Sequence, residues 1–259
     1  MTFKGIELLN YEEKLALFYG IMLGDGCLSY GNYGKSGTRH TICVVGSIYD
    51  DKPFFETIVI PLVKDLTSKE VKFHERPRIG CIDLRFDNPP FFYKLKGMGF
   101  IVGRKGPRIS VPKNFLDYNL MVNIIRGFMA TDGSLVLTKN PNKFYPRIEA
   151  NGISKPLILQ IYKFLYNVGL KGSFYKAIRL KVDPRFKIVQ DKYRFQFNGS
   201  KNLELFCDKI GFINPKHISK LSAFYQYSQK YDTELKNTNK EEKIVVRASL
   251  NSHYYNIWR

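Results

Sequence analysis

The sequence predicts an α+β protein built from two half-domains related by a pseudo-twofold axis, each with the element order αββαββα. Two observations carry this prediction. A nine-residue word occurs twice, as FYGIMLGDG at residues 18–26 and as IRGFMATDG at residues 125–133, so its two aspartates lie 107 residues apart. The same succession of helical and strand-like segments also follows each copy. An internal repeat of this length indicates two related structural units in one chain.

The first half begins with a capping-box signature, because Asn10 is followed three residues later by Glu13 and then by an apolar run. Alternating residues mark its strands, and Pro89-Pro90 opens its last helix. The expected elements are a helix at 12–24, strands at 27–33 and 39–47, a helix at 51–66, strands near 70–78 and 81–87, and a helix at 90–97.

The second half repeats this order. The expected elements are a helix at 117–131, strands at 134–139 and 143–151, a helix at 154–168, strands near 172–181 and 191–198, and a helix at 200–210. We therefore predict half-domains at 1–100 and 117–225, a basic Pro/Gly-punctuated connector at 101–116, and a tail at 226–259 with a solvated linker near 236–243.

Glycines inside both copies of the repeated word indicate a close helix crossing. A glycine in a helix interior costs about 1 kcal/mol relative to alanine, so Gly20, Gly24 and Gly127 suggest that two helix backbones approach each other there. Helices packed in this way bring Asp25 and Asp132 together. Two adjacent carboxylates form a site for a hard divalent cation, whereas a single Asp-Gly after a helix is more simply a turn.

Alternation along the strands separates an apolar face from a polar one. Tyr193, Phe195 and Phe197 share one face of the last strand. The polar sets are Lys192, Arg194, Gln196 and Asn198; Lys143, Tyr145, Arg147, Glu149 and Asn151; Lys72, His74, Arg76 and Arg78; and Cys81, Asp83, Arg85 and Asp87. Any half-exposed antiparallel strand has a polar face, but Gln and Asn beside Arg and Lys favour contact with DNA bases and phosphates.

Composition favours a polyanionic partner. The chain of 259 residues has a formal net charge of +18 and a pI near 9.6, and residues 139–201 alone hold 14 Lys or Arg against 3 Asp or Glu. Its four cysteines show no paired spacing, which argues against a zinc site or a disulfide framework. No apolar run suits a membrane span and no signal peptide is evident, so we expect a soluble intracellular protein of the cytoplasm or an organelle matrix.

The repeated words resemble the paired motifs of the LAGLIDADG homing endonucleases in their single-chain form, over about residues 10–225. Each copy keeps the helix glycine and the terminal Asp-Gly, but departs from the consensus at Gly24 and Thr131. The resemblance implies a monomer whose two saddle-shaped sheets sit in the DNA major groove. It also implies that Asp25 and Asp132 each serve one DNA strand, that the Gly24 and Thr131 carbonyls share in coordination, and that Mg²⁺ is the usual ion, two or three per pair of sites.

Two groups of site residues follow. The expected catalytic residues are Asp25 and Asp132, with Ser47, Asn88, Asn151 and Lys201 as candidates for an outer ring that organises water, while Gly46 leaves the ring of the first half in doubt. The expected DNA-binding residues are Lys72, His74, Arg76, Arg78, Arg85, Lys143, Tyr145, Arg147, Asn151, Arg179, Lys181, Lys192, Arg194, Gln196 and Asn198.

Three functions are compatible with this pattern. The first is a site-specific double-strand DNA endonuclease, intron-encoded or free-standing, that recognises a long asymmetric target and hydrolyses one phosphodiester per strand. An intein is not expected, because the sequence begins Met1-Thr2 and ends Trp258-Arg259 without splicing residues. The second is a maturase that binds intron RNA, and the third is a DNA-binding regulator without cleavage. Two retained aspartates favour the endonuclease, because a binding module has no need of paired like charges.

Overall fold

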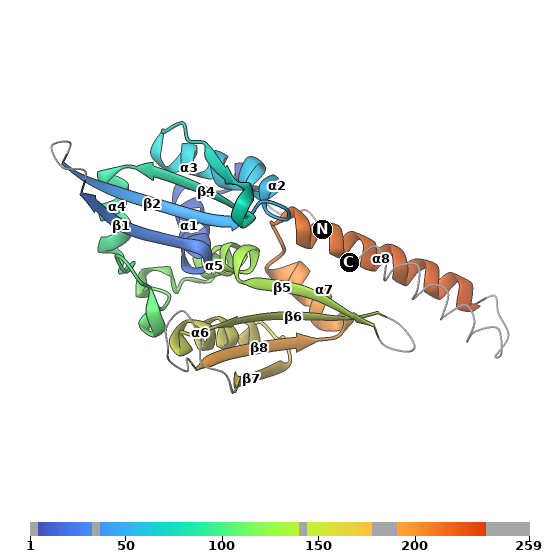
Figure 1. Cartoon of the computed structure of the whole chain (residues 1–259). Coiled ribbons are helices and arrows are strands. Elements are labelled where there is room, and N and C mark those ends of the chain that lie inside the picture. The colour runs from blue at the N-terminus through green and yellow to red at the C-terminus, as the bar shows by residue number, and fades with distance from the viewer. Residues whose placement is uncertain (1–4, 33–36, 140–143, 178–190, 237–259) are drawn as a thin grey trace.

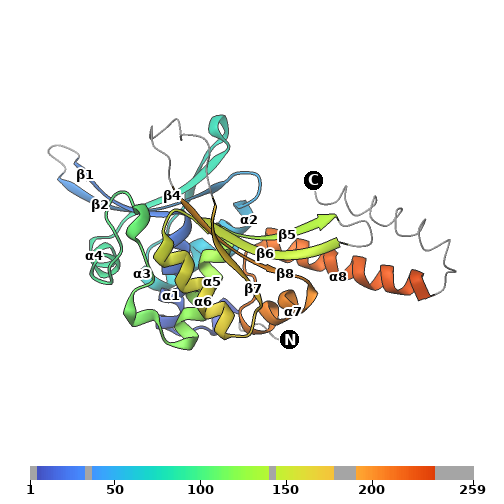
Figure 2. The same ribbon diagram turned by 90° about the horizontal axis from the view of Figure 1, so that it is seen from below.

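The computed structural model describes residues 5–32, 37–139, 144–177 and 191–236. Two four-stranded antiparallel sheets form the centre of two half-domains that lie side by side (Figure 1). Figure 2 shows helices α1, α3, α5 and α6 gathered on one side of these sheets. The predicted α+β fold with two αββαββα half-domains is confirmed.

The first half-domain follows the expected order closely. Its elements are α1 (Tyr11–Asp25), β1 (Gly26–Asn32), β2 (Thr38–Ser47), α2 (Lys52–Phe54), the π-helical turn η3 (Phe55–Val59), α3 (Ile60–Thr67), β3 (Phe73–Arg76), β4 (Cys81–Asp87) and α4 (Pro89–Gly97). Short 3-10 turns, η1 (Ile6–Leu8) and η4 (Pro77–Ile79), precede α1 and separate β3 from β4. The capping box at the start of α1 is formed, since the Asn10 side chain and the Glu13 side chain each accept from the other's backbone N–H.

The second half-domain repeats these elements after a connector that contains the 3-10 turns η5 (Gly106–Arg108) and η6 (Lys113–Phe115). Its elements are α5 (Tyr118–Thr131), β5 (Gly133–Lys139), β6 (Phe144–Gly152), α6 (Lys155–Asn167), β7 (Gly172–Ala177), β8 (Lys192–Asn198), α7 (Ser200–Lys209) and α8 (Pro215–Lys236). Side chains cap the first turns of three of these helices. Asp117 and Ser154 accept from backbone N–H groups at the start of α5 and α6, and Asn214 Oδ1 accepts from the Lys216 N–H at the start of α8.

The two halves meet where α1 crosses α5. A Cβ atom placed on Gly20 would lie 2.1 Å from the carbonyl oxygen of Ile124, and one on Gly127 would lie 2.2 Å from that of Leu17. No side chain fits at either position, so glycine allows the backbones to touch. The core is continuous through this crossing, because Phe18, Ile125 and their neighbours are fully buried on both helices.

Both sheets have the same strand order, β1-β2-β4-β3 in the first and β5-β6-β8-β7 in the second. Their registers also correspond, since Gly26 at the start of β1 lies opposite Val44, and Gly133 at the start of β5 lies opposite Ala150. Alternate residues face the helices and are buried: Leu28, Ile42, Val44, Ile82 and Leu84 in the first sheet, and Leu135, Ile148, Phe195 and Phe197 in the second.

The structure differs from the expected elements in two places. The strand expected near 70–78 is shortened to β3, because Pro77 cannot donate a ladder hydrogen bond and starts η4 instead. The strand expected near 172–181 is present as β7 up to Ala177, and residues 178–181 lie outside the described residues. Helix α8 was not expected at all. It runs from Pro215 to Lys236, across the predicted boundary between half-domain and tail, and it contacts β5 of the second sheet (Figure 1).

The four cysteines are free thiols, with Cys43 and Cys207 buried. Cys27 and Cys43 lie directly opposite each other on β1 and β2, a pairing that their sequence spacing did not indicate. Over the part of the chain that the structure describes, no helix has the length and apolarity needed to cross a membrane.

Candidate functional site

The two aspartates of the repeated word lie at the ends of the crossing helices. Asp25 is the last residue of α1, and Asp132 caps the end of α5 with its backbone N–H bonded to the carbonyl oxygen of Phe128. A Cβ atom placed on Gly24 would lie 2.0 Å from Oγ1 of Thr131, so the two helix ends are in direct contact. The crossing therefore brings both carboxylates into one recess between the sheets.

This recess disfavours two negative charges. Burial and then the charge of Asp132 raise the pKa of Asp25 to about 7. Burial of its carboxyl group also raises the pKa of Asp132, although the residue as a whole is exposed at the rim of the recess. Carboxylates that are this reluctant to ionise together indicate a site that is completed by a cation.

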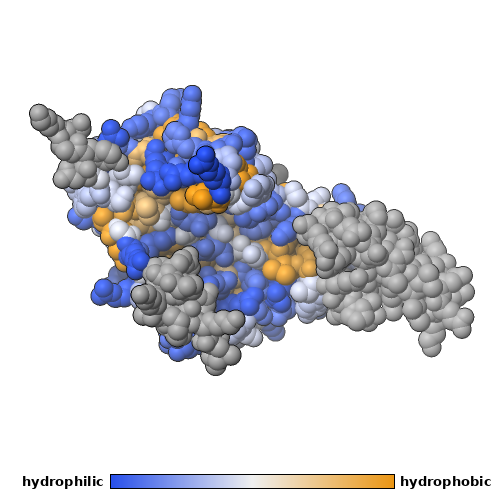
Figure 3. Space-filling model, viewed as in Figure 1, coloured by the Kyte–Doolittle hydropathy of each residue, from blue (hydrophilic) through white to orange (hydrophobic). Residues whose placement is uncertain are grey.

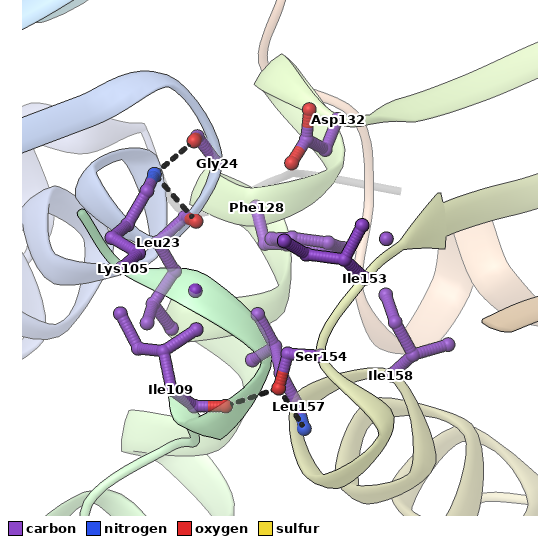
Figure 4. Close-up of a pocket in the computed structure, with 12 residues that line it drawn as sticks. Leu23, Gly24, Lys105, Ile109, Phe128, Asp132, Ile153, Ser154, Leu157 and Ile158 are labelled. Carbon is purple, nitrogen blue, oxygen red and sulfur yellow. Dashed lines mark hydrogen bonds between the residues drawn. The ribbon is translucent and has the colours of Figure 1, made fainter. Parts of the chain in front are cut away.

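A cation from the protein itself lies in the recess. The connector carries Lys105, whose ammonium donates to the carbonyl oxygen of Met22 at 3.0 Å. It also donates to the carbonyl oxygen of Leu23 at 2.9 Å and to that of Gly24, and Figure 4 shows these two hydrogen bonds. Burial lowers the pKa of Lys105, while Asp132 and Asp25 act in the opposite direction. The basic composition of the connector is visible in the sequence, but the position of Lys105 is not, because only the fold brings residue 105 to the end of α1.

The donor set suits a hard cation. Carboxylate and carbonyl oxygens are the ligands that Mg²⁺ and Ca²⁺ prefer. The carbonyl oxygens here already hold a positive charge, the ammonium of Lys105. Within the described ranges, no three side chains of His, Cys, Asp or Glu gather around one point. A metal ion here would therefore need backbone carbonyls, water or a bound phosphate beside the two aspartates.

The second half-site has a polar pair beside Asp132. On β6, Ala150 lies opposite Gly133, and Asn151 is the next residue. The ammonium of Lys192, at the start of β8, donates to Asn151 Oδ1 at 3.4 Å. The charge of Lys192 also acts on Asp132, lowering its pKa. Asn151 was expected near the site, and Lys192 was expected only as a DNA contact.

The matching positions of the first half-site carry different chemistry. By register, Val45 on β2 corresponds to Asn151 and Cys81 on β4 corresponds to Lys192. An apolar group and a thiol thus replace an amide and an ammonium. The two half-sites share their aspartates but not their surroundings.

A separate polar cluster lies on the side of Asp25. Asp51, just before α2, accepts from the Ser47 backbone N–H at 3.0 Å, from Asn214 Nδ2 at 3.0 Å and from Lys216 Nζ at 2.7 Å. Asn214 also donates to the carbonyl oxygen of Ala130 at 2.8 Å, which ties the start of α8 to α5. Lys216 and Asp51 both act on the pKa of Asp25, in opposite directions.

This cluster explains Gly46, where the sequence left a gap in the outer ring. A Cβ atom on Gly46 would lie 2.7 Å from the ring of Phe55 and 3.1 Å from Cβ of Asp51. The space that a longer side chain would need is therefore filled by the residues that start the next helix.

Three candidates for the outer ring lie elsewhere or serve the backbone. Lys201 is exposed on the first turn of α7, beyond the far end of β8, a strand about 20 Å long whose near end is Lys192. Asn88 caps α4 by accepting from the Phe91 backbone N–H at 3.0 Å. The hydroxyl of Ser47 donates to Oδ2 of Asp50 at 3.4 Å, in the turn that precedes α2. The structure does not bring Lys201 to the carboxylates. The start of β8, at Lys192, faces Asp132, and Lys201 follows the opposite end of that strand.

Each sheet has one carboxylate held between two arginines on its polar face. In the second sheet, Glu149 forms ion pairs with Arg147 and Arg194. In the first, Asp83 forms ion pairs with Arg76 at 2.7 Å and Arg85 at 3.4 Å. These arginines lie on the expected face, but each is already held by a carboxylate in the free protein.

The remaining expected DNA contacts are distributed around these groups. His74 is exposed on β3, Lys72 precedes that strand and Arg78 lies in η4 rather than in a strand. Gln196 donates to the Tyr175 hydroxyl at 2.6 Å. Tyr145 is exposed on β6 and Asn198 ends β8, whereas Lys143, Arg179 and Lys181 lie outside the described residues. Figure 3 shows hydrophilic side chains over both half-domains, with apolar patches between them.

Comparison with known proteins identifies the class of this fold. Residues 119–211 match the family model of the LAGLIDADG-like domain. The uncharacterized protein MJ0314 of Methanocaldococcus jannaschii is 25% identical over 171 residues, which are 64% of this chain and 59% of that protein. The chain thus spans less than two thirds of the curated relative that it matches.

Solved structures extend the likeness to both halves. The homing endonuclease I-DmoI, in complex with DNA and calcium, has a TM-score of 0.57 at 15% identity, over 83% of this chain and 99% of that one. The homing endonuclease I-LtrWI, bound to target DNA, has 0.57 at 12% identity, over 93% and 97%. The meganuclease I-AabMI, bound to uncleaved DNA, has 0.55 at 12% identity, over 91% and 97%.

These likenesses define a protein with the two-domain fold of the single-chain LAGLIDADG meganucleases. The resemblance seen in the two repeated words is therefore confirmed by the match of residues 119–211 to the LAGLIDADG-like domain and by the fold of both halves.

Proposed function

We propose that this protein is a site-specific, metal-dependent DNA endonuclease that hydrolyses one phosphodiester in each strand of a long asymmetric target. The observation that carries the proposal is the pair of carboxylates, Asp25 and Asp132, brought together at the ends of two crossing helices between two polar sheet faces. The same fold is found in I-DmoI and I-LtrWI, whose structures were solved in complex with DNA.

Asp25, Asp132 and the carbonyl oxygens of Gly24 and Thr131 would hold the metal. A divalent ion there would lower the pKa of a bound water and neutralise charge on the scissile phosphate. We propose Mg²⁺ as the ion and two or three ions for the pair of half-sites. Structures of I-DmoI with manganese, magnesium and calcium support a divalent ion of this kind.

The residues of the chain itself have separate tasks in this scheme. Asp25 and Asp132 must be ionised to bind the metal, so a cation that enters the recess lowers their pKa values and releases protons to solvent. Lys192 stands beside Asp132 with an ammonium that can hold a phosphate oxygen or orient a water, and Asn151 fixes that ammonium by accepting from it. In the first half-site, Lys216 places a cation on the side of Asp25 and is fixed by Asp51.

The polar sheet faces are suited to bind the duplex. Arginine can pair bidentately with guanine, and glutamine with adenine, in the major groove. Arg194 and Arg147 share Glu149, and Arg76 and Arg85 share Asp83, so these guanidinium groups are positioned before DNA arrives. A net charge of +18 adds attraction to phosphates that does not depend on sequence.

The same scaffold could serve a maturase or a DNA-binding regulator. A module that only binds nucleic acid gains nothing from two carboxylates in one recess, because negative charge near phosphate is repulsive without a metal. Burial and then the charge of Asp132 raise the pKa of Asp25 to about 7, so an ionised carboxylate at this place costs free energy when no cation is bound. We therefore favour cleavage over binding alone.

The experiment is selection of a target from a randomised duplex library in Mg²⁺, followed by comparison of the wild type with Asp25→Asn and Asp132→Asn. We expect both variants to lose double-strand cleavage while their affinity for the selected target in Ca²⁺ is unchanged or improved. Lys163→Met, on the exposed surface of α6, is the control for a change of charge away from the recess. Double-strand cleavage by a protein with both asparagine substitutions would remove these aspartates from the mechanism.

A further inference from the structure

Two free cysteines form a pair on the first sheet. Cys27 on β1 lies directly opposite Cys43 on β2, and their thiols are close enough to interact with each other. Both side chains lie on the polar face of the sheet, because Leu28, the neighbour of Cys27, is buried on the face that packs against the helices. The matching positions of the second sheet, Ser134 and Glu149, carry no thiol.

The backbone around this pair sets the distance between the two cysteines. The carbonyl oxygen of Leu28 accepts from the Gly103 N–H at 2.7 Å, on the side of β1 that faces away from β2. The N–H and C=O of one residue in an antiparallel strand point the same way, so the neighbouring Cys27 exchanges both of its backbone hydrogen bonds with Cys43. The Cα atoms of such a pair are about 5.5 Å apart, within the range of roughly 4.4–6.8 Å that a disulfide spans.

A bridge at this place strains the two strands. The Cβ atoms of directly opposed residues lie about 4.5–5.5 Å apart, whereas a disulfide holds its Cβ atoms at about 3.8 Å. Closing a bridge between Cys27 and Cys43 therefore draws β1 and β2 together by roughly 1 Å. Strained disulfides are reduced more readily than relaxed ones, so an excess of thiol opens this bridge again.

The movement of β1 is passed directly to Asp25. Only Gly26, the first residue of β1, separates Asp25 from Cys27. A Cβ atom placed on Gly26 would lie 2.5 Å from the Cα atom of Met22, so the start of β1 packs against the backbone of the last turn of α1. Displacement of a catalytic group by about 1 Å can slow a reaction on the order of 10²-fold.

We propose that Cys27 and Cys43 are a redox-sensitive pair that closes reversibly to a disulfide and slows DNA cleavage by displacing Asp25. The oxidant is a small disulfide such as glutathione disulfide. Cys27 is partly exposed and Cys43 is buried, so the Cys27 thiolate attacks one sulfur of the oxidant and releases one glutathione. The Cys43 thiolate then attacks the Cys27 sulfur and releases the second glutathione.

The exchange is balanced, because the two protein thiols lose two electrons and two protons and one glutathione disulfide becomes two glutathione thiols. The effect on cleavage rests on the proposed function, whereas formation of the bridge does not. The two parts of the inference therefore have separate tests.

The first test needs neither DNA nor a variant. The wild type is equilibrated with glutathione disulfide, its remaining thiols are alkylated, and its tryptic peptides are read by mass spectrometry. Lys35 and Arg39 lie between the two cysteines in the sequence, so a bridge joins two peptides that are otherwise found apart. We expect the linked pair to accumulate with oxidant and to separate again in dithiothreitol.

Cys81 is the internal control of this measurement. It is partly exposed, as Cys27 is, but the residues opposite it are Ser47 on β2 and Arg76 on β3, so it has no thiol with which to close. We expect Cys81 only as an alkylated thiol or as a glutathione adduct. If Cys27 also remained a thiol or a stable glutathione adduct, or were linked to another cysteine, the inference would be wrong.

The second test is cleavage of the selected target in Mg²⁺ after the oxidant has been removed. We expect the oxidised wild type to cut on the order of 10²-fold more slowly than the reduced protein, and dithiothreitol to restore the rate. Cys27→Ser, which introduces the residue found at the matching position of β5, should keep its own rate through the same treatment. Cys81→Ser should respond to oxidation as the wild type does.

The outcomes separate this inference from the proposed function. A bridged protein that still cut at the reduced rate would overturn the regulatory role and leave the endonuclease assignment intact, as would a Cys27→Ser protein that lost activity on oxidation. Absence of cleavage by the reduced wild type would overturn the proposed function and the regulatory role with it. The peptide measurement would still decide whether the pair closes.

Discussion

Replacing Gly20 with alanine would place a methyl group in the crossing of α1 and α5. That Cβ would lie 2.1 Å from the carbonyl oxygen of Ile124, 2.9 Å from its carbonyl carbon and 3.0 Å from its Cα. All three atoms belong to the backbone, so no side chain can rotate away. The best separation between carbon atoms is about 3.5–4.0 Å, and the helices must therefore move apart along much of their contact.

Overpacking of this kind costs about 1–3 kcal/mol, and each kcal/mol lowers the melting temperature of a protein of this size by roughly 2–4 °C. We therefore expect Gly20→Ala to melt roughly 2–12 °C below the wild type in a metal-free thermal scan, and Gly20→Leu to melt lower still. Since Gly20 is one turn before Gly24 and Asp25, the shift also separates the two carboxylates, and cleavage falls together with stability.

Gly97→Ala is the control for this substitution. Gly97 ends α4, and a Cβ atom there meets nothing within 4 Å, so the change is expected to be neutral or stabilising by about 0.4–1 kcal/mol. A melting temperature for Gly20→Ala within about 1 °C of the wild type, a shift smaller than even the lowest estimate of the cost, would refute the argument that the glycines allow a close backbone crossing.

Three further predictions concern charge. The pKa of Asp25 is about 7 in the folded protein, against an ordinary value of 3.8, so the folded protein binds this proton more tightly than the unfolded chain does. The stability that this group contributes is therefore present below pH 4 and is lost as the pH rises through 7. In chelator, the wild type should gain stability relative to Asp25→Asn as the pH falls from 8 to 5; a constant difference in melting temperature would contradict this. Lys192→Met should slow cleavage of one DNA strand by on the order of 10²-fold and spare the other, as gels of strand-labelled target would show, whereas an equal loss on both strands would refute the asymmetry of the half-sites. Arg194→Ala or Gln196→Ala should relax preference at one or two base pairs at a cost of about 1–3 kcal/mol each, and a uniform loss over all single-base variants of the target would leave the strand as a phosphate contact.

The sequence by itself determined the plan of the molecule. Helical and strand periodicities are local, so the succession of helices and strands could be predicted from the residues on each segment. The repeated word carried more, because its glycines mark where two helices can touch and its aspartates mark where those helices end. These features of the sequence are enough to predict that Asp25 and Asp132 meet.

Only the tertiary structure decided what surrounds those carboxylates. Lys105 reaches carbonyl groups more than 80 positions earlier in the chain, and Lys216 reaches Asp51 across 165 positions. Lys192, rather than Lys201, stands beside Asp132, because the direction of β8 in its sheet decides which end meets the recess. These long-range contacts depend on how the strands pair and where the connector runs. The periodicity of the sequence carries no information about either. Two short repeated segments determine the helix crossing, whereas the charged groups around Asp25 and Asp132 are brought there by segments from the rest of the fold.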